Sequence, residues 1–190
     1  PFEIARDVAR EQGLDIELEG FQKAMEIHRI NSSAGKFFGD MGGKKADFYT
    51  DILAKIREKE AFSFNEILYN PYSTCTIKTK VIGLVHNGEL LSQVKKGDKV
   101  EVILPETCFY IESGGQVSDT GWIKSVQSDL WNIRIDEVLH PSAGVIIHVG
   151  EVLYGSPKVG DQAVAEVDSN RRINIMRNHT ATHLLHAELR

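Results

Sequence analysis

The middle of the chain constrains the fold most, because it consists of short β-rich runs separated by turns. The run from 76 to 85 is rich in β-branched residues and stops at Asn87-Gly88, a dipeptide that favours a two-residue hairpin. Further runs with alternating or β-branched residues follow at 99–104, 122–126, 131–135, 145–149 and 163–167. Short strands at this spacing predict a small antiparallel β-barrel or a sandwich.

A weak internal repeat favours the barrel. The stretch Lys96-Gly97-Asp98-Lys99-Val100 resembles Val159-Gly160-Asp161-Gln162-Ala163, and in both a Gly-Asp turn leads into an alternating strand. The prediction concerns the fold alone, because barrels of this kind carry many unrelated functions.

Helical patterns flank the β region. Apolar residues recur at spacings of three and four in two stripes, the second being Leu18, Phe21, Met25 and His28. Glycines at 35, 39, 42 and 43 interrupt before a short helix at 47–59. A last helix begins after Asp168 or Ser169, either of which is a suitable N-cap. We therefore expect an α+β chain with helices over 1–68, the barrel over 69–168 and a C-terminal helix over 169–190.

Composition excludes several classes of protein. With 42% hydrophobic residues the chain can form a packed core, so wholesale disorder is excluded. No apolar run approaches the ~20 residues that span a bilayer, and no signal peptide is visible, so we expect no membrane partner. Two cysteines cannot form a disulfide framework, which favours a reducing, cytoplasmic compartment.

The net charge of −5 indicates no nucleic-acid partner, but the last segment departs from it. Residues 169–190 contain four arginines and one glutamate, which gives a local net charge of +3. Arg171, Arg172 and Arg177 are therefore candidate contacts to a phosphate backbone. Ordinary surface arginines remain an equal alternative.

His179 and His183 form the first candidate site. At i and i+4 on a helix both imidazoles project from one face, where they can share a metal ion, most commonly zinc. A helical zinc protease is excluded, because Thr180 replaces the glutamate that would act as general base. Two ligands do not complete a zinc site. The missing ligands would come from Cys75, Cys108, His140 or His148, or from beyond Arg190. Alternatively, the two histidines have only a packing role.

A glycine-rich loop is the second candidate. Gly114 and Gly115 allow a ligand to approach the main chain closely, and Glu112, Gln116 and Asp119 offer polar groups around them. A tight β-turn with polar flanks is the alternative.

Two motifs together carry a resemblance to a family. Phe-Tyr-x-Glu-Ser-Gly-Gly-Gln-Val-x-Asp-x-Gly at 109–121 and Asn-His-Thr-Ala-Thr-His-Leu-Leu-His at 178–186 resemble the alanyl-tRNA synthetases, as does the opening stretch over 1–25. The resemblance is weakest over 31–60, which looks like an insertion, and Cys108 stands where proline is expected.

The resemblance implies a position within a longer enzyme. Residues 1–68 would end the helical tRNA-recognition region, 69–168 would form a translation-protein-like barrel, and 169–190 would begin a truncated editing domain. The aminoacylation core, with its ATP and Mg²⁺, would lie upstream. Both ends of the chain are abrupt, which also favours an internal fragment.

The resemblance also implies a site and partners. His179 and His183 would be zinc ligands, completed by a later Cys-x-x-x-His motif. Gly114, Gly115 and Gln116 would border the pocket in which tRNA(Ala) mischarged with serine or glycine is hydrolysed. Partners would be tRNA(Ala), alanine and ATP, and no catalytic base is identified. We expect the fragment alone to be inactive. A freestanding trans-editing deacylase and a non-catalytic RNA-binding barrel are the alternatives.

Overall fold

The computed structural model describes residues 20, 23, 42–60, 67–112, 116–127, 130–142 and 144–189. The helical stripes expected before residue 42 lie outside these residues, apart from Gly20 and Lys23, which are helical. Two long helices enclose the β region in sequence, α3 (Gly42–Glu60) and α4 (Ser169–Glu188). The strands between them are β1 (Leu68–Tyr69), β2 (Thr76–Lys80), β3 (Gly83–His86), β4 (Glu89–Leu91), β5 (Lys99–Ile103), β6 (Glu106–Thr107), β7 (Gly121–Ser125), β8 (Asn132–Ser142), β9 (Val145–Tyr154) and β10 (Gln162–Val167).

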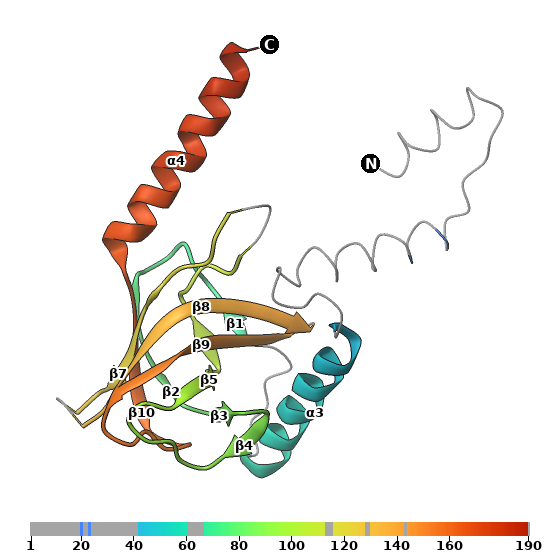
Figure 1. Ribbon diagram of the computed structural model, residues 1–190, viewed down its shortest axis with the longest axis vertical. Coiled ribbons are helices and arrows are strands. Elements are labelled where there is room, and N and C mark those ends of the chain that lie inside the picture. Colours follow the sequence, from blue (N-terminus) through green and yellow to red (C-terminus); the bar gives the residue numbers. More distant parts are fainter. Residues whose placement is uncertain are drawn as a thin grey trace.

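One antiparallel sheet of eight strands dominates the described structure, in the order β2-β10-β7-β8-β9-β5-β3-β4 (Figure 1). The two-residue strands β1 and β6 pair in parallel beside it. The expected α+β class and the β runs are therefore confirmed. The run 76–85 forms two strands, β2 and β3, where the sequence pattern suggested one.

The expected closed barrel is not confirmed. Among the described residues the hydrogen-bonded order ends at β2 on one side and β4 on the other. The strands β2 and β3 are separated at Val81 and Ile82, where the chain changes partners. The Val81 amide donates to the Asp161 carbonyl at 3.0 Å, whereas the Ile82 amide donates to the Ile103 carbonyl at 3.0 Å. One continuous segment thus supplies β2, which pairs with β10, and β3, which pairs with β5, so it forms two short strands in place of one long one.

The turns follow the sequence closely. Asn87 and Gly88 both have positive φ, 51° and 78°, as a type I′ hairpin requires, and they join β3 to β4. The internal repeat is the same turn built twice. In one copy Asp98 Oδ2 accepts from the Lys95 amide at 2.9 Å, and in the other Asp161 Oδ2 accepts from the Lys158 amide at 3.0 Å.

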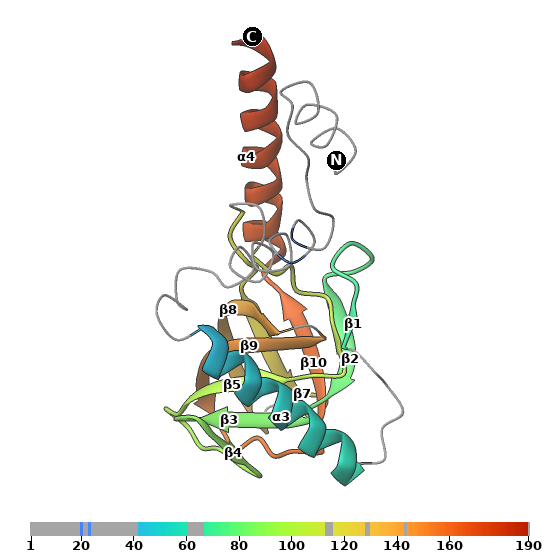
Figure 2. The ribbon, with the colours of Figure 1, turned by 90° about the vertical axis from the view of Figure 1, so that its right-hand side faces the viewer.

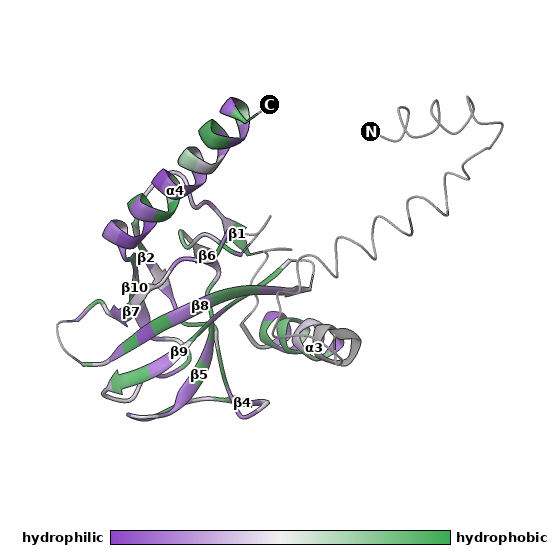
Figure 3. Cartoon of the chain, turned by 45° about the horizontal axis from the view of Figure 1, so that its top comes forward, coloured by the Kyte–Doolittle hydropathy of each residue, from purple (hydrophilic) through white to green (hydrophobic). Residues whose placement is uncertain are grey.

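The core lies between the curled sheet and α3, which covers one side of it (Figure 2). In β10, and along most of β5 and β8, buried residues alternate with more exposed ones, whereas consecutive residues are buried in β3 and at the start of β9. Figure 3 shows the hydropathy of the strands. Helix α3 contributes four buried side chains: Tyr49, Ile52, Leu53 and Ile56. This helix begins at Gly42, so the glycines at 42 and 43 form its first turn and do not interrupt it.

Helix α4 starts directly after β10 and projects away from the sheet (Figure 1). None of its residues is fully buried, and several large apolar side chains are exposed, namely Ile173, Met176, Leu184 and Leu185. Contact with the sheet is therefore confined to the first turns of α4. Neither described helix is both long and apolar enough to cross a membrane.

Candidate functional site

The first turn of α4 is anchored by a capping residue and an arginine. Asp168 is the N-cap, as one of the two expected alternatives, and its Oδ1 accepts from the Arg171 amide at 3.0 Å. The Arg171 side chain reaches the opposite loop, where Nη1 donates to the Ser118 carbonyl at 2.7 Å. Sequence-local capping and one long side chain thus fix where α4 leaves the sheet.

Arg172 joins four separate segments of the chain. Nη1 donates to the Pro71 carbonyl at 2.9 Å and contacts the Cys75 sulfur at 3.6 Å. Nη2 donates to the Cys108 carbonyl at 2.6 Å and to Asp119 Oδ2, and Nε donates to the same oxygen at 3.0 Å. A guanidinium has five N–H donors, and this set of contacts uses all five.

Asp119 is the anionic partner in this cluster. Its side chain is 3% exposed, against 13% for Arg172, so both charges are largely removed from water. Besides the guanidinium, Oδ2 accepts from the Tyr110 amide at 2.6 Å, and the Asp119 amide donates back to the Tyr110 carbonyl at 3.0 Å. A buried pair satisfied in this way holds its surroundings rigidly, because breaking it leaves an uncompensated charge.

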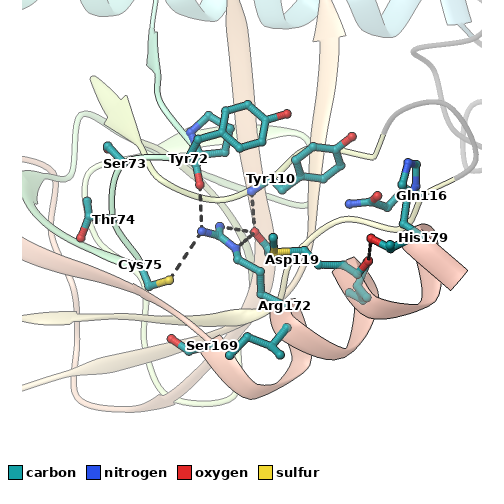
Figure 4. A pocket seen from close by; sticks show the side chains of 15 residues that line it. Tyr72, Ser73, Thr74, Cys75, Tyr110, Gln116, Asp119, Ser169, Arg172 and His179 are labelled. Atoms are coloured by element: carbon teal, nitrogen blue, oxygen red, sulfur yellow. Dashed lines mark hydrogen bonds and ion pairs between the residues drawn. The ribbon is translucent and has the colours of Figure 1, made fainter.

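A cavity of about 540 Å³ opens above this ion pair (Figure 4). Three segments line it: the turn from Pro71 to Cys75, the loop that carries Tyr110, Gln116 and Asp119, and the first three turns of α4. The volume lies within the usual range of about 300–1,000 Å³ for small-molecule and cofactor sites. Apolar side chains of α4 and polar groups of both loops share its walls.

His179 lies on the cavity wall, and His183 follows one turn later. The two Nε2 atoms are 2.9 Å apart, with ring centroids separated by 4.6 Å, and both side chains are exposed. Two nitrogens bound tetrahedrally to one zinc ion would be roughly 3.3 Å apart, given Zn–N bonds of about 2.0–2.1 Å. The observed separation of 2.9 Å is close to that spacing, so the distance between the two nitrogens is compatible with a shared zinc ion.

The described residues offer no third zinc ligand. Within that part of the chain, no group of three His, Cys, Asp or Glu side chains is arranged to hold a metal ion. His148 is fully buried elsewhere, between Thr107 Oγ1 at 2.7 Å and the Val102 carbonyl at 3.1 Å. Cys108 is also buried, and desolvation raises the pKa of its thiol to about 11, which disfavours the thiolate that binds metals.

The remaining candidates from the sequence are placed as follows. Gln116 lines the cavity on the same side as His179 (Figure 4), whereas Gly114 and Gly115 lie outside the described residues. The three arginines do not share one surface role. The guanidinium groups of Arg171 and Arg172 bind loop carbonyls and Asp119, whereas Arg177, five residues after Arg172 on α4, is exposed.

Neither Tyr72 as a lining residue of the cavity nor Arg172 as the centre of the cluster was predicted from the sequence. Tyr72 lies in a turn without a recognisable motif, and a basic segment gives no sign of which arginine becomes buried. One signal was present in the sequence: an acidic residue in a glycine-rich loop and an arginine at a helix start are natural partners once the loop meets the helix.

Comparisons with known proteins agree on one family. The family profile described as tRNA synthetases class II (A) matches residues 1–171. Alanine–tRNA ligases from Chloroflexus aurantiacus and Anaeromyxobacter dehalogenans are each 35% identical over the whole chain, and that of Staphylococcus aureus strain RF122 is 34% identical. The chain spans about a fifth of the length of these relatives.

Proposed function

Since the chain belongs to the tRNA synthetases class II (A) family, we propose that it is an internal part of an alanine–tRNA ligase, an enzyme that charges tRNA(Ala) with alanine using ATP. The observation that carries this proposal is the alignment of the whole chain with alanine–tRNA ligases at 34–35% identity. The aminoacylation core, with ATP and Mg²⁺, then belongs to the other four fifths of the enzyme. A cytoplasmic location accompanies this proposal.

We further propose that the segment contributes to hydrolysis of tRNA(Ala) mischarged with serine or glycine. A binding pocket for alanine cannot strongly reject a side chain that adds one hydroxyl, and discrimination of this kind reaches only about 10²-fold. A second, hydrolytic site supplies the missing selectivity. The cavity beside His179 supports this role, because it combines polar groups from two loops with a candidate metal-binding pair.

His179 and His183 are proposed as two ligands of a zinc ion, and the other ligands come from residues that follow Arg190. When bound, zinc would supply Lewis acidity or orient the ester. The chain's own contribution is to hold both imidazoles on one face of α4 and to fix the start of that helix through Arg172. The next ~150 codons of the gene should encode a Cys-x-x-x-His motif, and its absence would remove the support for a four-ligand site.

The direct test is zinc binding by the 190-residue chain, with zinc sulfate as the probe in calorimetry. Two imidazoles should give weak binding that His179→Ala abolishes, while His86→Ala, which removes a histidine from the end of β3, should leave it unchanged. Tight stoichiometric binding that is lost in His179→Ala would show that the site closes without later residues and would contradict the proposed division of ligands.

The hydrolytic role is tested on the full product of the gene. Seryl-tRNA(Ala) should be deacylated by the wild type and not by His179→Ala, with alanylation unchanged. Loss of alanylation in the same variant would instead indicate a general structural defect. A protein that binds tRNA but deacylates nothing would favour the non-catalytic RNA-binding module.

A further inference from the structure

Two tyrosines that line the cavity, Tyr72 and Tyr110, lie at its rim and have no role in the proposed zinc site. Tyr72 is 85% exposed, more than any other exposed large hydrophobic side chain among the described residues. Its ring meets that of Tyr110 edge to face, with centroids 6.5 Å apart and planes inclined by 64°. Figure 4 shows both rings on the same side of the Arg172–Asp119 pair.

The buried ion pair holds the backbone next to both rings, although neither tyrosine lies in a helix or strand. Arg172 Nη1 binds the carbonyl of Pro71, the residue before Tyr72, at 2.9 Å. Asp119 Oδ2 binds the amide of Tyr110 at 2.6 Å. The two segments, 38 positions apart in sequence, are therefore fixed by one Arg–Asp pair. A preorganised aromatic surface binds a flat ligand with little loss of conformational entropy.

The surroundings of the rings suit a nucleotide. The cavity combines the hydroxyl group of Ser73 with the amide of Gln116, which offers both a donor and an acceptor to the edge of a base. Burial raises the pKa of Tyr110 further above neutrality, so its ring stays uncharged beside a phosphate chain. A shallower groove on α4 adjoins the cavity through Ile173 and carries the exposed Arg177, a cation suited to a phosphate.

We infer that Tyr72 and Tyr110 form a stacking site for the unpaired 3′-terminal nucleotide of an RNA strand, with the base on the exposed ring of Tyr72. Aromatic side chains stack on bases in proteins that bind single strands. The inference rests on the proposed function, because a nucleotide held at this rim would present its sugar hydroxyls to the cavity wall that carries His179.

The test measures binding of a 5′-labelled RNA tetranucleotide, ACCA, by fluorescence anisotropy, without added zinc or amino acid. Tyr72→Ala should raise the dissociation constant about 5- to 150-fold, the range of stacking losses on alanine substitution. Tyr72→Phe keeps the ring and should stay within about twofold of the wild type. Tyr154→Ala, which removes an exposed tyrosine at the end of β9 outside the cavity lining, is the matched control and should not change binding.

A second probe isolates the base. The same RNA with an abasic 3′-terminal residue should bind to the wild type as weakly as ACCA binds to Tyr72→Ala. Equal binding of the two RNAs, equal losses in Tyr72→Ala and Tyr72→Phe, or no binding of ACCA to the wild type would each overturn the inference. Because Tyr72 is exposed, its variants should unfold at the wild-type urea concentration.

The outcomes also separate this inference from the proposed function. Binding with the expected pattern, together with a full-length enzyme that deacylates nothing, would contradict only the editing role. Deacylation that is intact in Tyr72→Ala, together with unchanged ACCA binding, would contradict only the stacking site.

Discussion

Replacing Arg172 with alanine tests whether the ion pair joins α4 to the sheet. The substitution leaves the carboxylate of Asp119, 3% exposed, without its cation, and it removes the donors to the carbonyls of Pro71 and Cys108. Breaking a buried charge pair by deleting one partner reduces stability by about 3–5 kcal/mol. Domains of this size lose about 2–4 °C of melting temperature per kcal/mol, so we expect a decrease of about 6–20 °C.

Urea unfolding followed by tryptophan fluorescence measures the loss, since Trp131 is buried in the core. Arg177→Ala is the matched control, because this exposed arginine lies on the same helix and should change stability by no more than about 0.5 kcal/mol. In a double-mutant cycle, Asp119→Ala should cost much less in the Arg172→Ala background than alone. A loss below about 1 kcal/mol for Arg172→Ala, or additive effects in the cycle, would refute the reasoning.

Three further predictions concern the core. Burial lowers the pKa of His148 to about 4, so the folded chain binds this proton more weakly than the unfolded chain. The contribution of His148 to the free energy of unfolding is therefore complete above about pH 6.5, and the free energy falls by at most roughly 3 kcal/mol as the pH drops to 4. Urea titrations at several pH values measure this loss. Gly150→Ala should lose at least about 2 kcal/mol in the same assay, because its Cβ would lie 1.9 Å from the Arg134 carbonyl oxygen in the neighbouring strand. The half-buried thiol of Cys75 should react with Ellman's reagent in the native protein. The thiol of Cys108 is buried and its pKa is raised to about 11, so it should react only after unfolding.

Each of these has a contrary outcome. His148→Gln should flatten the acid limb of the stability curve, and an unchanged limb would assign it to other groups. Gly97→Ala, where a Cβ meets nothing within 4 Å but φ is 87°, should lose only about 1–2 kcal/mol, and an equal loss at both glycines would argue against a backbone clash. Two thiols of equal native reactivity would contradict the burial of Cys108.

Local sequence predicted the strands and turns because their causes are local. Asn87-Gly88 adopts positive φ at both positions, and each Gly-Asp turn is closed by its own aspartate. The path of the sheet was not predictable in this way. The change of partner at Val81 and Ile82 depends on where β10 and β5 lie, which no local pattern records.

In the candidate site, too, features with a local cause were predictable from the sequence and features that depend on distant segments were not. The spacing of His179 and His183 placed both rings on one helical face, as the structure has them. Arg172 was expected to face solvent or phosphate, because a window of sequence shows its charge and not its depth. Its contacts lie 53 to 101 positions away in the chain, at Asp119 and Pro71.

Helix α3 belongs to the same folding unit as the sheet, because its side chains form part of the core. It comes from the segment over 31–60 that was expected from the sequence to be an insertion, yet Ile52, Leu53 and Ile56 are as deeply buried as the strands they cover. The Cδ1 atom of Ile56 packs so closely over Gly83 that a Cβ there would lie 2.8 Å from it. A segment expected to be an insertion thus supplies part of the core, and removing α3 would uncover the strands beneath it.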